Sequence, residues 1–528
     1  MSTDEKPRLA LERVERSRDI PKHHVAAPAS KGMAASFFTF VTPGTPAKPY
    51  PNNSAASFRN PWPSWHSPTR AEVWEHLSWG EDQDQCIQLA TSHLSDVPAS
   101  PTPPEKAQRP QFGDITNWPD SNGAKAARLL SIEKPDFSFN QPGDPRAKVT
   151  WLGHASMLVQ FPPLDQDKPG VQPVRCLFDP MFSMRCSPSQ NAGPIRSYPP
   201  PCQVDDLPPI DAVFISHNHF DHLDYDTIQA IWKSNVDTVR FFVPLRNAEW
   251  FMTSCGIPET NVTEMDWWDC AHLAAPSSTV SGAVPRMMKI WCTPAQHNSG
   301  RSGPSDANCT LWSSWYIEYR DPRRDSYRLF FAGDTGYQFH SSPAWPPSPN
   351  RPYDDQADDG KFPACPAFAE IRDKLGQPDL LLMPISVGST FSYLRSFVPL
   401  PDWISPFPRH SMGLTAANHM PPWDAVRVVK LMTEQSRDGS KEAVRRPQEK
   451  QTLAIAMHWG TFVTDPLEVM KTLGQLEWAC KQQGLRFARL LPSSEQPRDG
   501  VNEKGPDLAK DEEAPCFLAL NHGQSIYC

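Results

Sequence analysis

The residues of this chain best suited to chemistry lie in one heptapeptide, Ser216-His217-Asn218-His219-Phe220-Asp221-His222. Its three histidines and its aspartate offer the nitrogen and oxygen ligands that zinc accepts in proteins. In an extended backbone, His217 and His219 project to the same side and can bind one metal ion. Asp221 and His222, where the chain would turn into a helix, can face a second ion nearby. The heptapeptide therefore predicts a metal site rather than a chance cluster of surface histidines.

Further ligands are expected at the ends of other strands. His297, Asp334 and His458 each come shortly after an apolar segment, and Asp334 lies between two glycines. Taken alone, each of them has a plain alternative as a buried core residue or a turn residue. Together with the heptapeptide they extend the predicted metal site.

Short apolar segments that would position these residues recur along the chain, separated by amphipathic ones. Strands are predicted at 148–154, 156–161, 175–178, 212–216, 241–244, 288–293, 312–319, 328–332, 380–385 and 452–457. Helices are predicted at 225–233, 366–375, 421–434 and 466–483. This alternation indicates an α/β or α+β layered catalytic fold rather than an all-β one.

Proline is the compositional outlier, with 59 residues in 528, roughly twice its ordinary usage. The excess predicts long irregular segments around a core. Residues 1–57 are expected to be a disordered arm carrying an apolar patch at 37–41. Residues 58–147 form an N-terminal extension with a linker over about 97–125. The catalytic domain covers 148–528, with surface inserts at about 338–362, 394–412 and 435–450.

Charge and cysteine content exclude several classes of protein. The net charge of −9 disfavours a nucleic-acid-binding protein. No window approaches 18 consecutive apolar residues, and the charged N-terminus lacks the apolar region of a secretory signal. The 12 cysteines include no Cys-x-x-Cys pair, which favours buried reduced thiols over a disulfide scaffold. We therefore expect a protein that is neither secreted nor membrane-spanning.

Several motifs resemble those of a known family: Val149–Ala155, Phe178–Ser183, Phe331–Tyr337 and His458–Phe462. With the heptapeptide, they resemble the metallo-β-lactamase fold, a four-layered αββα sandwich. More closely, they resemble the N-acyl-phosphatidylethanolamine-hydrolysing phospholipase D family. The resemblance spans most of residues 148–337 and 363–465.

The resemblance implies a ligand set of seven residues. His217, His219 and His297 would hold one zinc ion. Asp221, His222 and His458 would hold the other, and Asp334 would bridge the two. Two zinc ions per chain can lower the pKa of a shared water molecule and neutralise phosphodiester oxygens. Asp221 and Asp334 are therefore also expected to be catalytic.

Three further residues are assigned roles near this set. His419 is expected to be a general acid or a substrate-orienting residue, with a loop-capping histidine as the alternative. Arg301 could bind a substrate phosphate, since guanidinium groups match phosphoryl oxygens, or could simply be solvated. His154 is expected to support the ligands from behind.

This chain departs from the family pattern at Phe220 and at the inserts 338–362 and 394–412. Phe220 stands where the family commonly carries tyrosine, so a hydroxyl contact is missing from the ligand loop. Residues 391–404 mix aromatic and aliphatic side chains with arginine, which suits a loop that contacts a lipid surface. Ordinary packing over the sandwich is the alternative for that segment.

The sequence therefore predicts a zinc-dependent, phospholipase D-type phosphodiesterase. It would hydrolyse N-acyl-phosphatidylethanolamine to N-acylethanolamine and phosphatidic acid. The alternatives are another hydrolase of this fold, such as a lactonase, a soluble phosphodiesterase or a nuclease, and a non-catalytic lipid-binding protein. The expected partners are the N-acylated phospholipid and a membrane surface, without nucleic acid, and the resemblance also implies a homodimer. We expect an intracellular, peripheral location at a cytoplasmic or mitochondrial membrane face.

Overall fold

The computed structural model describes fifteen longer segments of the chain and two single residues. They are residues 9–19, 21–26, 55–79, 82, 84–92, 94, 121–139, 146–163, 172–236, 238–274, 287–320, 326–341, 362–385, 406–434, 452–463, 465–490 and 514–528.

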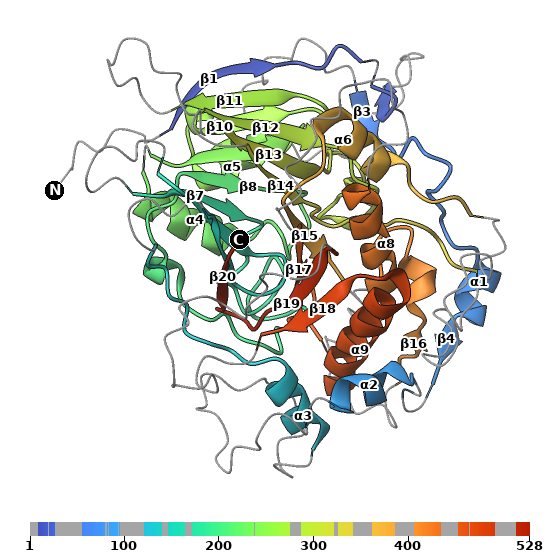
Figure 1. The fold of residues 1–528 in the computed structure, drawn as a ribbon. Helices are drawn as coiled ribbons and strands as arrows, with labels where there is room; N and C mark the ends of the chain where they lie inside the picture. Colours follow the sequence, from blue (N-terminus) through green and yellow to red (C-terminus); the bar gives the residue numbers. More distant parts are fainter. Residues whose placement is uncertain are drawn as a thin grey trace.

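Two β-sheets form the centre of the molecule (Figure 1). The seven-stranded sheet has the order β10-β9-β8-β7-β6-β5-β20. Its strands are β5 (Lys148–Trp151), β6 (Met157–Phe161), β7 (Val174–Phe178), β8 (Ala212–Phe214), β9 (Arg240–Pro244), β10 (Val262–Met265) and β20 (Ser525–Tyr527). The strands β7, β8, β9 and β10 run parallel to one another.

The nine-stranded sheet has the order β1-β11-β12-β13-β14-β15-β17-β19-β18. Its strands are β1 (Ala10–Glu15), β11 (Cys270–Ala274), β12 (Met287–Thr293), β13 (Ser314–Arg320), β14 (Tyr327–Phe331), β15 (Leu380–Pro384), β17 (Leu453–Met457), β18 (Arg486–Arg489) and β19 (Cys516–Ala519). Each strand from β14 to β18 in this order is parallel to its neighbours. The strands β14 and β17, which lead to Asp334 and His458, therefore end at the same edge of the sheet.

Helices cover the outer faces of both sheets (Figure 1). The described helices are α1 (Arg70–Glu75), α2 (Cys86–Ser92), α3 (Asn122–Leu129), α4 (Tyr225–Ser234), α5 (Ala248–Cys255), α6 (Ala367–Leu375), α8 (Pro422–Thr433) and α9 (Pro466–Gln483). Ile228 of α4 and Phe251 of α5 belong to one apolar cluster with the seven-stranded sheet. The helices α8 and α9 pack on the nine-stranded sheet through a second cluster. The result is the four-layered αββα sandwich that the sequence predicts.

Aromatic side chains hold the two sheets together. The ring centroid of Phe178 on β7 lies 4.8 Å from that of Phe214 on β8 and 4.8 Å from that of Phe331 on β14. All three side chains are fully buried. Burying such rings contributes about 1.5–3 kcal/mol each to the free energy of folding. The layer between the sheets is therefore a packed core on which the strand ends rest.

The predicted strands and helices of the catalytic domain are confirmed to within a few residues, and α9 has the predicted bounds. Asp465 caps α9 by accepting a hydrogen bond from Leu467 N at 2.8 Å, and Pro466 occupies its first turn. Gly484 ends it with a left-handed φ of 72°. The twelve cysteines are free thiols, as expected.

The expectation of a disordered arm over 1–57 is wrong for its described parts. β1 pairs antiparallel with β11 at the edge of the nine-stranded sheet, and Leu11 and Val14 pack against the core. Further along, β2 (His24–Ala26) pairs with β3 (Ala55–Phe58). A register shift between Leu11 and Arg13 breaks the two-residue alternation by which such a strand would be found in the sequence.

The remaining expectations on linkers and inserts fall mostly outside the described residues. That holds for the patch at 37–41, for most of the linker at 97–125, and for the segment at 391–404. Only 338–341, 362 and 406–412 of the three inserts are described, the last including β16 (Arg409–His410), which pairs with β4 (Leu77–Ser78). The domain division itself stays a prediction.

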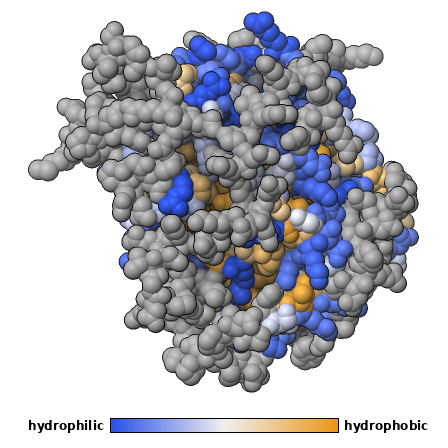
Figure 2. All heavy atoms as spheres, in the orientation of Figure 1, coloured by the Kyte–Doolittle hydropathy of each residue, from blue (hydrophilic) through white to orange (hydrophobic). Residues whose placement is uncertain are grey.

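Within the described ranges, no helix is long and apolar enough to cross a membrane. On the face seen in Figure 2, hydrophobic residues are visible near the centre, and hydrophilic residues lie chiefly to their right.

Candidate metal centre

The predicted ligands meet at one edge of the two sheets. The heptapeptide follows β8 of the seven-stranded sheet, while His297, Asp334 and His458 follow β12, β14 and β17 of the nine-stranded sheet. Predicted ligands as far apart in the sequence as Asp221 and His458 thus come within 3.8 Å of one another. All seven side chains predicted as ligands lie in this one cluster.

Three histidines form the first group. His217 Nε2 lies 2.8 Å from His219 Nδ1 and 3.2 Å from His297 Nε2. His297 Nε2 lies 3.3 Å from His219 Nδ1. Each neutral imidazole has one nitrogen without a proton, and lone pairs so close together repel one another unless a cation lies between them. The group therefore has the chemistry of a cation site.

Asp221, His222 and His458 form the second group. His222 Nε2 lies 3.1 Å from His458 Nε2 and 3.6 Å from Asp221 Oδ2. His458 Nε2 lies 3.8 Å from the same carboxylate oxygen. Two imidazole nitrogens and one carboxylate oxygen again converge, with a carboxylate that could neutralise part of a cation's charge.

Asp334 lies between the two groups. Its Oδ2 is 3.2 Å from His222 Nε2 and 3.8 Å from His297 Nε2. Its Oδ1 lies 2.9 Å from His458 Nε2, yet this buried atom accepts no hydrogen bond. A buried carboxylate oxygen without a hydrogen bond is costly in the absence of a cation. These residues therefore fit divalent metal ions.

The protonation states also suit metal binding. Burial and the neighbouring imidazoles lower the pKa of His217 and His297 well below the usual range, and burial lowers that of His219 to about 4. Burial disfavours the charge on Asp334, but the His222 and His458 imidazoles hold the pKa of its carboxyl well below the usual range. Neutral imidazoles beside ionised carboxylates are the forms that bind metal ions. In the second group, burial lowers the pKa of His222 and His458, but the Asp334 carboxylate outweighs it and raises the pKa of both, so a metal ion there would replace a proton on each ring.

Hydrogen bonds fix which ring nitrogen faces the centre. His222 Nδ1 lies 2.7 Å from Asp179 Oδ2, and His297 Nδ1 lies 3.1 Å from Asn418 O. Since both oxygens accept, the proton belongs on Nδ1 and Nε2 is free for a metal. Asp179 also accepts from Ser216 N at 2.7 Å. Asp179 lies within the motif Phe178–Ser183, but nothing in the local sequence marks it as the partner of His222.

His154 supports the second group, as predicted. Its Nε2 lies 3.0 Å from Asp221 Oδ2, and its carbonyl oxygen accepts a hydrogen bond from His458 N at 2.8 Å. Its φ of 49° is left-handed, a conformation that costs energy for this residue type. Thr461 Oγ1 accepts from His154 N at 2.7 Å and helps to hold this backbone. His154 thus contacts two members of the group at once.

Arg301 contacts the ligand loop. Its Nη1 donates to Asn218 O at 2.8 Å and to Leu223 O at 2.7 Å. Its guanidinium carbon lies 3.9 Å from the centroid of the Phe220 ring, a cation–π contact. The guanidinium therefore holds the ligand loop in place, and its contact with a substrate phosphate stays a prediction. Phe220 serves this contact, for which no hydroxyl is needed.

His419 reaches the centre from the segment before α8. Its Nε2 lies 3.2 Å from Asp334 Oδ2, and its side chain is 19% exposed, whereas that of Asp334 is 1% exposed. It therefore lies at the solvent-facing side of the cluster. The loop-capping alternative does not account for this contact with Asp334.

Two glycines bring the Asp334 loop close to its neighbours. Gly333 has a φ of 60°, and a Cβ there would lie 2.6 Å from Ser216 Cβ. A Cβ on Gly336 would lie 2.0 Å from the carbonyl carbon of Ala417. The glycines that flank Asp334 are thus required by close approach, and they set the distance between Asp334 and His419.

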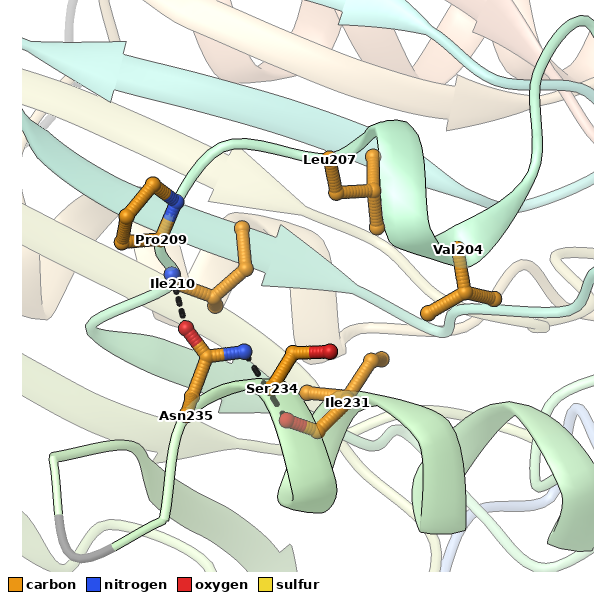
Figure 3. A pocket seen from close by; sticks show the side chains of 7 residues that line it. All are labelled: Val204, Leu207, Pro209, Ile210, Ile231, Ser234 and Asn235. Atoms are coloured by element: carbon orange, nitrogen blue, oxygen red, sulfur yellow. Dashed lines mark hydrogen bonds between the residues drawn. The ribbon is translucent and has the colours of Figure 1, made fainter. Parts of the chain in front are cut away.

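A separate small hollow lies beside α4 (Figure 3). It is lined by Val204, Leu207, Pro209, Ile210, Ile231, Ser234 and Asn235. The side-chain amide of Asn235 is already hydrogen-bonded to the backbone. Its Oδ1 accepts from Ile210 N at 2.8 Å, and its Nδ2 donates to Ile231 O at 2.8 Å. With no titratable group in its lining, this hollow offers no chemistry.

Comparisons with known proteins agree with this geometry. A family described as "Beta-lactamase superfamily domain" matches residues 174–344, which contain six of the seven predicted ligands. N-acyl-phosphatidylethanolamine-hydrolyzing phospholipase D 1 of Caenorhabditis elegans is 29% identical over 318 residues, 60% of this chain and 64% of that protein. The chain thus spans just under two thirds of that relative.

Two further relatives extend the comparison. An uncharacterized protein of Mycobacterium tuberculosis is 37% identical over 347 residues, 66% of this chain and 68% of that protein. N-acyl-phosphatidylethanolamine-hydrolyzing phospholipase D, mitochondrial, of Saccharomyces cerevisiae is 33% identical over 188 residues, 36% of this chain and 34% of that protein. Among solved structures, the metallo-β-lactamase fold protein YhfI from Bacillus subtilis covers 72% of this chain and 100% of its own at 14% identity, with a TM-score of 0.31. The fold assignment does not depend on this match, whose TM-score is low.

Proposed function

Since the chain belongs to the N-acyl-phosphatidylethanolamine-hydrolysing phospholipase D family of the metallo-β-lactamase superfamily, we propose that it is a dinuclear zinc phosphodiesterase. Its substrate is N-acyl-phosphatidylethanolamine, and its products are N-acylethanolamine and phosphatidic acid. It acts at a membrane surface as a peripheral protein and assembles as a homodimer.

The observation that carries this proposal is the position of Asp334 between two groups of three ligands. Asp334 Oδ2 is within 4.0 Å of His217, His222 and His297, and Oδ1 is 2.9 Å from His458. A carboxylate shared by two groups suits a pair of metal ions, the arrangement typical of phosphodiester hydrolysis. The donor set contains no thiolate and leaves ligand positions open, as in catalytic zinc sites.

The side chains of this centre have distinct tasks in the reaction. Two zinc ions bound there would polarise the phosphoryl oxygens and lower the pKa of a water molecule. Asp334 and Asp221 supply the negative charge that keeps both groups together. His419, on the exposed side, donates a proton to the oxygen that leaves with N-acylethanolamine as its bond to phosphorus breaks. Arg301 keeps the ligand loop in place.

Product analysis tests the reaction. Purified protein is incubated with N-acyl-phosphatidylethanolamine in mixed micelles, beside a chelator-treated sample and an Asp334→Asn variant, which keeps the shape but removes the charge. We expect N-acylethanolamine and phosphatidic acid in the untreated wild-type sample alone, measured by mass spectrometry. No release by folded, zinc-loaded protein would sink the phospholipase assignment, and lactones and soluble phosphodiesters would be the next substrates to assay.

A further inference from the structure

One contact ties the N-terminal extension to a predicted ligand. Asn60 Nδ2 donates to His297 O at 2.7 Å, and His297 N donates to Asn60 Oδ1 at 3.2 Å. A single side-chain amide thus pairs with both backbone groups of one residue. These two hydrogen bonds fix the backbone of His297 in the way that pairing with a neighbouring β-strand would.

The rest of this loop is held by other means. Gln296 N donates to Thr335 Oγ1 at 3.0 Å, and Gln296 O accepts from Gly336 N at 2.8 Å. The residue before His297 is thus fastened to the Asp334 loop. In the part of the chain that the structure describes, Asn60 is the hydrogen-bond partner of the backbone of His297.

Asn60 is itself held from both sides. Phe58 N donates to Asn308 O at 2.8 Å, and Arg59 N donates to His23 O at 2.9 Å. After Asn60, the Trp62 ring stacks on Trp267 with centroids 5.4 Å apart. The amide therefore reaches His297 from a segment with little freedom to move.

The segment before β3 adds an anchor of its own. His23 Nε2 and His24 Nε2 lie 2.7 Å and 2.9 Å from the two oxygens of Asp266. Each histidine has its own carboxylate oxygen at hydrogen-bond distance, which distinguishes this cluster from the metal centre, where ring nitrogens face one another. The His23 ring also stacks on Trp267 at 4.1 Å. This cluster of His23, His24 and Asp266, called the latch below, fixes β2 and hence β3.

From these contacts we propose that Asn60 is a positioning residue that sets the metal affinity of the group His217, His219 and His297. The inference rests on the proposed function, since it assumes that this group binds zinc. Without the amide, the backbone N–H and C=O of His297 lose their partners, and the loop turns to find others. The His297 ring then no longer points its Nε2 at His217 and His219. Losing such an outer contact typically costs about 10- to 100-fold in metal affinity.

Zinc titration of the metal-free full-length protein against a competing chelator measures this directly. We expect two sites in the wild type. In Asn60→Ala, one site should weaken about 10- to 100-fold while the other keeps its affinity. Asn60→Asp has the same shape but puts a carboxylate oxygen where Nδ2 donates, so it should weaken the same site. In a His219→Ala background, which already lacks that site, Asn60→Ala should have no further effect.

Arg59→Ala is the matched control, because Arg59 is adjacent and exposed, and its backbone bond to His23 survives the change. Its two zinc affinities should equal those of the wild type. If Arg59→Ala weakens the same site, the effect belongs to the extension as a whole and the role given to Asn60 is wrong. Two unchanged affinities in Asn60→Ala would overturn it as well. A wild type without zinc sites would instead refute the proposed function.

Discussion

At the scale of single residues, the centre depends on side chains that hold the ligands from behind. Asp179 fixes His222, Asn60 fixes His297, and His154 contacts both Asp221 and His458. Each of them decides where a ligand atom points without being a predicted ligand itself. Activity should therefore be sensitive to substitutions at residues other than the seven predicted ligands.

His154→Asn tests one such residue. Asparagine tolerates the left-handed backbone at this position but is too short to reach Asp221, which lies 3.0 Å from His154 Nε2. We expect the affinity of the group Asp221, His222 and His458 for zinc to fall about 10- to 100-fold. Chelator competition measures it, and the group containing His297 serves as the internal control. Equal affinities in variant and wild type would show that the contact with Asp221 does not matter.

His419→Gln tests the proposed proton donor. Both zinc ions should remain bound, because His419 is not among the seven predicted ligands. Turnover should fall about 10²- to 10⁴-fold, the usual contribution of general acid catalysis. With a substrate whose leaving group needs no proton, such as a nitrophenyl phosphodiester, the loss should be much smaller. A loss of the same size with both substrates would argue against proton donation.

The sequence indicates the residues of the ligand cluster but, His154 apart, not the residues that support them. His297, Asp334 and His458 are recognisable because each follows an apolar strand. Asn60 and His297 are 237 positions apart, and nothing in the local pattern around Asn60 connects them. The role of Arg301 could not be predicted because the carbonyls that it binds belong to a loop that is formed only in the fold.

At the scale of elements, a residue of one strand caps a helix elsewhere in the chain. Glu264 on β10 accepts a hydrogen bond from Ala248 N at 2.9 Å and so caps α5, whose own N-cap Asn247 makes no such side-chain bond. Because this cap comes from another element, it does not show in the sequence around α5, and the sequence pattern does not predict this helix. A local cap alone does not decide which helices the sequence predicts: α9 is predicted, whereas α1 and α3, which Thr69 and Ser121 cap, are not.

Glu264 also makes a pH-dependent contribution to stability. Burial raises the pKa of its carboxyl to about 6, against an ordinary value of 4.5. The folded state thus binds this proton more tightly than the unfolded state does. The contribution is full below pH 4.5 and is lost as the pH rises to about 6, at a cost of about 2 kcal/mol in the free energy of unfolding.

Glu264→Gln should remove this pH dependence while keeping an acceptor for Ala248 N. Above pH 7, the variant should be more stable than the wild type by up to about 2 kcal/mol, and the two should converge near pH 4.5, as measured by urea unfolding. Glu249→Gln, on an exposed position of the same helix, should show no such gain. A constant difference between Glu264→Gln and wild type across this range would contradict the assignment.

The loop that carries Asp334 allows a steric test. Gly336→Ala would place a Cβ 2.0 Å from the Ala417 carbonyl carbon, although the φ of Gly336 is not left-handed. The segment 416–418 must then move away, and His419 with it. We expect lower thermal stability and lower turnover, with zinc still bound. In Gly484→Ala, where nothing lies within 4 Å of the new Cβ, stability should fall by about 1 kcal/mol and turnover per folded molecule should not change.

At the scale of the whole molecule, the N-terminal arm supplies β1, an edge strand of the nine-stranded sheet. β1 covers the edge of β11, and its outward side chains Glu12, Arg13 and Glu15 are charged, which discourages further strand pairing. Arg16 Nη1 then binds Asp269 Oδ2 at 2.6 Å at the end of β1. The Pro-rich composition of the first 57 residues does not indicate this strand, because the six residues of β1 are too few to change the average composition of the segment.

Val14→Asp should detach this strand, because Val14 packs on the core beside β11 and a carboxylate there would lose its water. The free edge of β11, with five buried residues in succession, would then be open to pairing with other chains. We expect faster tryptic cleavage after Arg13 and Arg16 and more light scattering on storage, while freshly purified protein keeps its zinc. Glu12→Ala, on an exposed position of the same strand, controls for the loss or gain of one charge. If Val14→Asp resists trypsin as the wild type does, pairing with β11 does not depend on this side chain, and the arm must be held mainly by the contacts of Arg16 and the latch at Asp266.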